Sequence, residues 1–160
     1  MKVHTFELNL VWTGNRGSGT DRYTSYDRTH EIHIEGKPVL YGSAHPSFRG
    51  NVERHNPEDL LVAALSSCHL LSYLHVCADA GIVVTAYEDH ATAVMRATRD
   101  GGHFTDALLR PRVTIAAGDP QLASALHERA HEGCFIAASV NFPVRCEPVI
   151  VTEAPSSPTA

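Results

Sequence analysis

The sequence predicts an α+β fold in which β-sheet lies around or across two helices. Two apolar segments with helix-capping residues at their ends, residues 56–81 and 119–133, predict the helices. Alternating apolar and polar residues before, between and after these segments predict strands. This order of elements is typical of α+β proteins. We expect residues 1–152 to form a single domain and residues 153–160 to be a disordered tail.

The chain before the long helix predicts short strands. Residues 3–12 alternate between apolar and polar side chains, which is typical of a half-buried strand. After a glycine-rich turn at residues 14–19, residues 23–35 predict one or two further strands and residues 39–41 a short one. Residues 42–55 are expected to form a loop that leads into the helix.

The long helix has recognisable signals at both ends. Asn56 suits the N-cap, Pro57 the first helical position, and Glu58 is favoured beside the positive end of the helix dipole. Gly81 suits the left-handed position after the last turn. Apolar residues lie almost all the way round, which is typical of a buried helix. Its polar ends and polar middle argue against a membrane span.

The second half of the chain predicts two long strands, a helix and a last strand. Residues 82–98 and 103–117 are the long strands, and the glycines near residues 100–102 predict a hairpin between them. A helix over residues 119–133 begins with an Asp-Pro cap and ends at a glycine. Residues 143–151 are expected to form the last strand.

Composition limits the classes of function. The chain has 160 residues and a formal net charge of −5, which argues against binding nucleic acid. The N-terminus does not have the pattern of a signal peptide, so we expect a cytoplasmic protein that does not contact a membrane. In that compartment 4 cysteines are expected to be reduced. The 11 histidines are scattered along the chain and suggest no close set of metal ligands.

Cys68 and Cys134 are the candidate reactive cysteines. A free cysteine is often only a small buried apolar residue. Cys68, however, lies in a polar Ser-Ser-Cys-His step in the middle of the apolar helix, and Cys134 directly follows the glycine that ends the second helix. Unpaired N–H groups at such a position would favour a thiolate. The two could form a reversible disulfide if their Cα atoms come within about 7 Å.

The remaining candidates have simple structural explanations. Cys77 and Cys146 are interpreted as inert, Cys77 because it lies roughly 13 Å along the helix from Cys68. A zinc site is not expected, because Cys68, His75 and Cys77 are too far apart to share an ion and the chain has no Cys-x-x-Cys pair. His69, beside Cys68, is more often packed than catalytic in such a position, although it could assist proton transfer.

Three segments together resemble the OsmC/Ohr family, the osmotically inducible and organic hydroperoxide resistance proteins. Residues 56–68 resemble the family segment that leads to the reactive cysteine, with Glu58 ten residues before Cys68. Residues 133–140 are similar to the segment of the second cysteine, and residues 12–20 to the N-terminal strand and turn of the OsmC branch. The order matches over roughly residues 4–152.

The resemblance implies antiparallel sheets around two central helices in a domain-swapped homodimer. It implies a peroxiredoxin-like antioxidant enzyme that reduces organic hydroperoxides to alcohols. Cys68 would be the peroxidatic cysteine and Cys134 the resolving cysteine. Arg16 would stabilise the Cys68 thiolate and Glu58 would hold Arg16 in place. The resemblance implies no bound cofactor or metal, and it suggests an external dithiol reductant of lipoyl type.

The proposed chemistry is consistent with these residue types. A thiolate attacks the O–O bond, and a nearby guanidinium favours the thiolate because it stays charged. The sulfenic acid that results would condense with Cys134 to form a disulfide. In a straight helix Glu58 lies roughly 15 Å from Cys68, so bridging by Arg16 needs a bent helix or a partner chain. A redox-sensing or small-ligand-binding protein with the same thiol pair, and a histidine-based metal-binding protein, are the alternatives.

Overall fold

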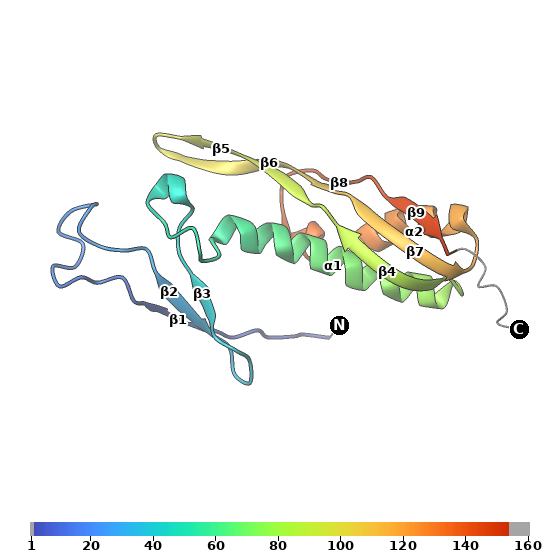
Figure 1. The fold of residues 1–160 in the computed structure, drawn as a ribbon, viewed down its shortest axis with the longest axis horizontal. Helices are drawn as coiled ribbons and strands as arrows, with labels where there is room; N and C mark the ends of the chain where they lie inside the picture. The colour runs from blue at the N-terminus through green and yellow to red at the C-terminus, as the bar shows by residue number, and fades with distance from the viewer. Residues whose placement is uncertain (1, 154–160) are drawn as a thin grey trace, which may run out of the picture. The chain divides into compact units, whose positions relative to one another are not determined.

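The computed structural model describes residues 2–153 and divides the chain into two compact units (Figure 1). Residues Met1–Leu61 form the N-terminal unit and residues Val62–Ala160 the C-terminal unit. The tail predicted at residues 153–160 lies, except for its first residue, outside the described part. A single domain over residues 1–152 stays a prediction.

The N-terminal unit contains a three-stranded antiparallel sheet in the order β1-β2-β3. Its strands are Asn9–Trp12, His30–His33 and Leu40–Gly42, and a short 3₁₀ helix follows at Pro46–Phe48. These strands are shorter than the sequence predicts. Arg28 gives the reason in the segment before β2, because its guanidinium donates to the carbonyls of Tyr23 and Tyr26 and lies over both rings. Those carbonyls therefore accept hydrogen bonds within a loop and do not take part in strand pairing.

Helix α1 (Pro57–Asp79) confirms the predicted long helix and its caps. The backbone N–H of Asp59 donates to Asn56 Oδ1 at 2.8 Å, and Gly81 has a positive φ of 72°. By length and composition α1 is the one helix in residues 2–153 that could cross a membrane. The core helix of a soluble protein passes the same test, so this property alone assigns no membrane role.

The C-terminal unit contains two mixed three-stranded sheets. In the orders β4-β7-β9 and β5-β6-β8, the first pair is antiparallel and the second pair parallel. The predicted sheets are therefore antiparallel only in part. The strands are β4 (Val83–Asp89), β5 (Thr92–Thr98), β6 (Gly101–Leu109), β7 (Pro111–Ala117), β8 (Val144–Cys146) and β9 (Val149–Thr152).

The two long strands and the last strand predicted in this half are wrong in one respect, because each is divided between the two sheets. The chain leaves one sheet and enters the other near residues 90, 110 and 147. One hydrogen bond joins two of these crossings. The backbone N–H of Arg110 donates to Asp89 Oδ1 at 2.7 Å. Pro111 follows and has no N–H to continue the ladder. Residues that favour strands lie on both sides of each bend, so the sequence predicts one strand where the structure has two.

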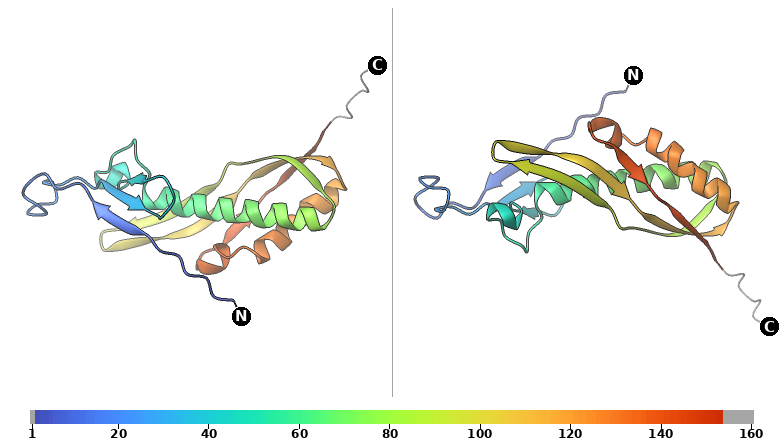
Figure 2. Two further views of the ribbon diagram at one scale, coloured as in Figure 1. Left: turned by 90° about the horizontal axis from the view of Figure 1, so that it is seen from below. Right: turned by 90° about the horizontal axis from the view of Figure 1, so that it is seen from above.

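Helix α2 (Pro120–Glu132) begins and ends as predicted. Asp119 caps it by accepting from the Gln121 N–H, and Gly133 follows its last turn. Both helices contribute to one core with β7 (Figure 2). That core consists of Tyr73, Val76, Cys77, Ile82, Val113, Ile115, Ala123, Leu126 and Ala130. It holds the middle of α1 and the end of α2 in fixed relation, and those are the positions of the candidate cysteines.

Candidate active site

Cys68 and Cys134 come together in the C-terminal unit. Cys68 is half-buried in the middle of α1, and Cys134 is buried just beyond the end of α2. All four cysteines are free thiols. The Cys68 thiol lies close enough to Cys134 to raise the pKa of the Cys134 thiol. The two sulfurs that the sequence selects are therefore neighbours, although 66 positions separate them.

Cys134 is a protonated thiol rather than the thiolate that its position suggested. Burial is the main cause of its raised pKa, and the Cys68 thiol adds to it. The backbone N–H of Ala137 donates to Cys134 Sγ at 3.4 Å and acts in the opposite direction. The backbone N–H groups after α2 lower the pKa of Cys134 as expected, but the increase caused by burial is larger.

The polar step around Cys68 is satisfied locally. Ser67 Oγ donates to the Ala63 carbonyl at 2.7 Å, which turns this hydroxyl back onto its own helix. Ser66 Oγ donates to Asp89 Oδ2, the same carboxylate that accepts from the Arg110 N–H. Ser66 therefore ties α1 to the point where the chain passes between sheets, and this anchors the turn of helix that carries Cys68.

Arg16 and Glu58 both belong to the N-terminal unit, but they are not paired there. Arg16 Nε donates to the Ser25 carbonyl at 3.1 Å and lies 3.8 Å from Asp27 Oδ2. About half of the Arg16 side chain is exposed. Glu58 Oε2 is buried and has no hydrogen-bond partner among the described residues. The acid that contacts Arg16 is thus Asp27, which the sequence did not single out.

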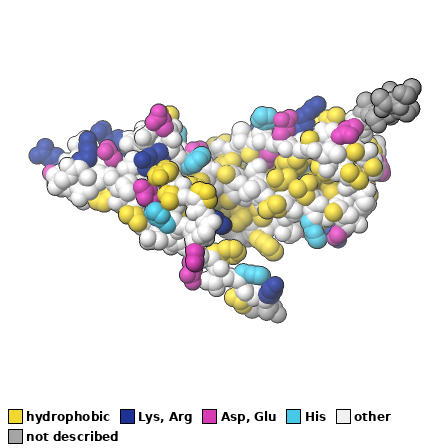
Figure 3. Space-filling model, turned by 60° about the horizontal axis from the view of Figure 1, so that its bottom comes forward, with side chains coloured by type: hydrophobic (Ala, Val, Ile, Leu, Met, Phe, Trp, Pro, Cys, Tyr) yellow, Lys and Arg dark blue, Asp and Glu magenta, His cyan; other side chains and the backbone are white. Residues whose placement is uncertain are grey.

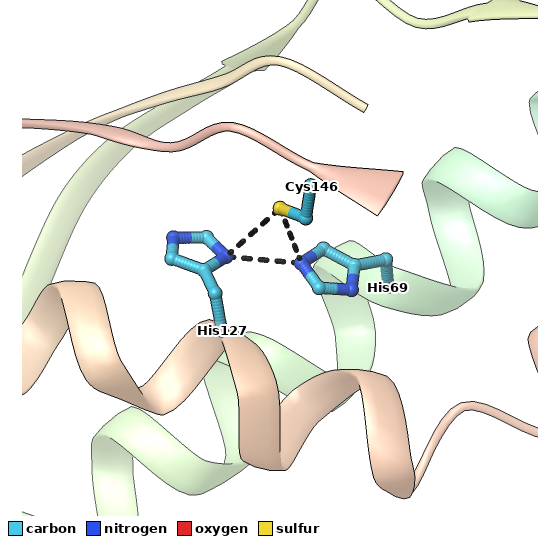
Figure 4. Close-up of side chains that lie close together, drawn as sticks. All are labelled: His69, His127 and Cys146. Atoms are coloured by element: carbon cyan, nitrogen blue, oxygen red, sulfur yellow. Dashed lines mark hydrogen bonds between the residues drawn. The ribbon is translucent and has the colours of Figure 1, made fainter. Parts of the chain in front are cut away.

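A second cluster, shown in Figure 4, joins His69 and Cys146, for which the sequence predicts only structural roles, to His127. His69 Nε2 on α1 lies 2.9 Å from His127 Nδ1 on α2. Cys146 Sγ on β8 lies 3.6 Å from His69 Nε2 and 3.9 Å from His127 Nδ1. Both histidines are buried. Cys146 is therefore not an isolated apolar residue, and His69 contacts a group from another helix.

The imidazole rings of this cluster are stacked in an aromatic column. The His127 ring lies between those of His69 and Tyr73, with centroid distances of 5.2 and 3.8 Å. Burial, and secondly the neighbouring His69, lowers the pKa of His127 to about 3; burial also lowers the pKa of His69. Burial raises the pKa of the Cys146 thiol to about 12. At neutral pH the cluster therefore consists of neutral imidazoles and a protonated thiol.

One sequence signal could have revealed this cluster. Residues 127–131 read His-Glu-Arg-Ala-His, which is the H-E-x-x-H pattern on a helix. It places two histidines on one face of α2, one turn apart. The contributions of His69 and Cys146 could not be read in the same way, because they come from other elements and meet α2 only in the folded unit.

Comparisons with known proteins identify the family and agree with the fold. The family model described as OsmC-like protein matches residues 50–148, more than half of the chain. The chain therefore belongs to the OsmC-like family. A search of curated proteins found no match.

Solved structures extend the likeness over nearly the whole chain. An OsmC-like protein of unknown function from Vibrio cholerae is 29% identical, with a TM-score of 0.82 over 92% of this chain and 100% of that one. An organic hydroperoxide resistance protein from Elizabethkingia anophelis is 17% identical, with a TM-score of 0.66 over 95% and 99%. A Legionella pneumophila protein described as organic hydroperoxide resistance protein OsmC is 19% identical, with a TM-score of 0.64 over 94% and 98%. The last two establish likeness of fold alone.

Proposed function

We propose that this protein is a thiol-dependent peroxidase that reduces organic hydroperoxides to alcohols. The contact between the Cys68 and Cys134 thiols is the observation that carries the proposal. Membership of a family whose solved structures include organic hydroperoxide resistance proteins supports it. A pair of free thiols in one compact unit provides both the attacking sulfur and the sulfur that closes the cycle.

The proposed cycle has three steps. The Cys68 thiolate attacks one oxygen of the hydroperoxide, the O–O bond breaks, and the leaving alkoxide takes a proton to become the alcohol. Cys134 then attacks the sulfenic acid on Cys68, which releases water and forms a disulfide. An external dithiol, for which we propose a lipoyl-type compound, reduces this disulfide by thiol–disulfide exchange. No bound cofactor takes part in these steps.

Arg16 is proposed to stabilise the Cys68 thiolate and to polarise the peroxide, and Glu58 to orient Arg16. The half-exposed Arg16 guanidinium donates to the carbonyls of Ser25 and Thr24 and forms a long ion pair with Asp27; exposed contacts of this kind contribute little and can be exchanged for others. The buried and unpaired Glu58 oxygen supports the assignment, because a carboxylate in that state needs a cationic or donor partner. These roles rest on the family resemblance of the segments that carry the two residues.

We also propose that the active form is a domain-swapped homodimer. Phe6 and Leu8, in the segment before β1, are 93% and 60% exposed in the single chain. On α1, Leu71 is 67% exposed although the helix is apolar on most faces. Figure 3 shows hydrophobic side chains over a wide area of the C-terminal unit. Apolar area of this extent supports burial against a second copy.

The central test uses cumene hydroperoxide and a dithiol. Wild-type protein should consume the peroxide over many turnovers, Cys68→Ser should not, and Cys77→Ser should act as the matched control that retains activity. One equivalent of peroxide without dithiol should lower the intact mass by about 2 Da, through a disulfide that peptide mapping assigns to residues 68 and 134. A disulfide that forms without turnover would favour the redox-sensing alternative instead.

Mixed dimers test the role of Arg16 and the domain swap together. Arg16→Ala and Cys68→Ser chains are each expected to be inactive, while Arg22→Ala controls for loss of a loop cation. If Arg16 acts on the Cys68 of the other chain, mixing the two inactive variants restores one complete site per mixed dimer. If mixing restores no activity although mixed dimers form, the two residues act within one chain.

A further inference from the structure

The cluster of His69, His127 and Cys146 contains three metal-binding side chains that the peroxidase cycle does not use. Their ligand atoms, two ring nitrogens and one sulfur, lie within 4.8 Å of one another. They come from α1, α2 and β8, all in the C-terminal unit. We propose that these three residues bind a zinc ion. This goes beyond the proposed peroxidase function, and it departs from the sequence-based expectation of no metal.

The spacing of the three atoms matches the edges of a tetrahedral zinc site. With Zn–N bonds of about 2.0–2.1 Å and Zn–S bonds of about 2.3 Å, tetrahedral angles separate two nitrogens by about 3.3 Å and a nitrogen from sulfur by about 3.6 Å. The measured N–N distance is 2.9 Å and the measured N–S distances are 3.6 and 3.9 Å. An ion at the centre needs the imidazoles to separate by only a few tenths of an ångström.

The ligand atoms of the cluster, two imidazole nitrogens and one sulfur, determine which metal ions it can bind. Imidazole and thiolate are ligands for zinc and copper, whereas calcium and magnesium require oxygen ligands that this cluster lacks. Zinc has no redox chemistry, so it can be held one residue from Cys68 without oxidising the thiol pair. On binding, the Cys146 thiol gives up its proton to solvent, and any proton between the imidazoles moves to an outer ring nitrogen.

A fourth ligand has room beside the cluster. An open pocket of about 370 Å³ is lined by His127 and Cys146 and also by Glu128 and His131. A zinc ion on three protein ligands keeps a fourth position for water or an external ligand. That position would open into this pocket, where the polar side chains of Glu128 and His131 are available to a bound water. The pocket also gives an entry path for the ion.

Zinc affinity should be measured on the full chain with Cys68→Ser and Cys134→Ser, which removes the separate pair of thiols. In competition with a chromophoric chelator, this protein should bind one zinc per chain. Adding Cys146→Ala should weaken binding by at least about 100-fold, since even outer-shell changes commonly cost 10- to 100-fold. His75→Gln and Cys77→Ala, which lie outside the cluster, should leave the affinity unchanged. Equal affinity with and without Cys146→Ala would overturn the proposal.

Cobalt binding provides a second test of the site, because its absorption bands report the ligands directly and do not depend on the stability of the fold. Co²⁺ bound by the same full chain should give an ultraviolet sulfur-to-cobalt band and visible bands of tetrahedral coordination, and Cys146→Ala should remove the sulfur band. Cys146 is half-buried, so this variant should keep the fold even if changes at the buried histidines do not. Absence of the sulfur band in the parent, or binding of copper but not zinc, would overturn the assignment.

The metal site and the peroxidase site can be separated. In the otherwise native chain, Cys146→Ala should keep hydroperoxide turnover, while Cys68→Ser should keep zinc binding. Loss of peroxidase activity in every variant, the wild type included, would then refute only the proposed function and leave the zinc measurement intact.

Discussion

Cys68 and His69 are adjacent on α1, but they lie in two different chemical settings. Cys68 is half-buried and faces a second thiol at the end of α2. His69 is buried and faces the imidazole of His127 and the thiol of Cys146. One residue of a helix corresponds to a rotation of about 100°, which is enough to direct neighbouring side chains into separate environments.

The difference between the two sites lies in what surrounds them. The thiol pair sits where α2 has just ended, so a backbone N–H lies against the buried Cys134 sulfur while Cys68 stays partly exposed. The imidazole cluster sits beside the stacked ring of Tyr73, in the layer between both helices and the sheet. A site that must change its covalent state needs access, whereas a site that holds an ion benefits from rigid walls. The predictions below test this contrast.

Tyr73→Ala should have the largest effect and should damage the imidazole cluster first. Tyr73 is fully buried, stacks on His127, and donates from its hydroxyl to the Ala123 carbonyl at 2.9 Å. Removing a buried aromatic ring should lower the free energy of unfolding by about 3–5 kcal/mol in urea titrations. His75→Ala, on the exposed side of the same helix, should change it by at most about 0.5 kcal/mol. Similar losses in both variants would show that the column is not part of the core.

Alkylation should show that Cys146 reacts slowly in metal-free protein. Because burial raises the pKa of Cys146 to about 12, its thiolate is scarce at neutral pH. Allowing for the greater nucleophilicity of a more basic thiolate, its reaction with iodoacetamide should be roughly 10²-fold slower than that of a free thiol. The rate should rise with pH up to about 12. Mass spectrometry of the chain with Cys68→Ser and Cys134→Ser measures it, and rapid labelling of Cys146 at pH 7 would contradict the burial argument.

The sequence was sufficient for features that depend on local signals. The ends of both helices follow from Asn56, Gly81 and Asp119, whose capping roles are set within a few residues. Cys68 could be selected because it lies in a polar segment of an otherwise apolar helix, and Cys134 because it directly follows a glycine that ends a helix. The α+β class follows from the same signals, since two capped helices among alternating segments leave few other arrangements.

Features that depend on distant pairing could not be read from the sequence. The division of long strands between two sheets is fixed by a contact between Asp89 and Arg110, which no periodicity encodes. The parallel pairing of β8 with β6 brings Cys146 into position, and it exists only in the folded unit. Within the single chain Arg16 contacts Asp27 of its own loop, and its pairing with Glu58 stays a prediction. Pairwise chemistry between elements is a property of topology rather than of local pattern.

Weakening the start of α2 should lower stability without altering either site. Asp119 accepts a hydrogen bond from the Gln121 N–H, so Asp119→Ala should lower the free energy of unfolding by about 1 kcal/mol, and Asp119→Asn should restore most of it. His127 lies two turns further on and Cys134 beyond the far end. Peroxide turnover and zinc affinity, measured beside urea unfolding, should therefore stay at wild-type values. A large change in either would mean that the sites depend on the whole helix and not on their immediate neighbours.

Replacing both histidines of the cluster should have the smallest effect on stability at neutral pH. His69 Nδ1 and His127 Nε2 are buried without hydrogen-bond partners among the described residues, so both rings carry unsatisfied polar atoms. In the chain with His69→Leu and His127→Phe, apolar groups of similar size remove these atoms, and the free energy of unfolding should stay within about 1 kcal/mol of wild type.

The same double variant should differ from wild type in acid. Folded His127 takes up a proton only near pH 3, whereas an unfolded histidine does so near pH 6.5, so the unfolded wild type binds more protons between these values. The contribution of neutral His127 to the stability of wild type is therefore fully present above about pH 6.5 and is lost as pH falls toward 3. Urea titrations across this range should show a shallower loss for the variant. If the free energy of unfolding falls equally steeply with pH in both proteins, groups other than His127 dominate the loss of stability in acid. A variant that keeps its stability and loses zinc would indicate that the cluster is maintained for its ligand, because the fold does not need it.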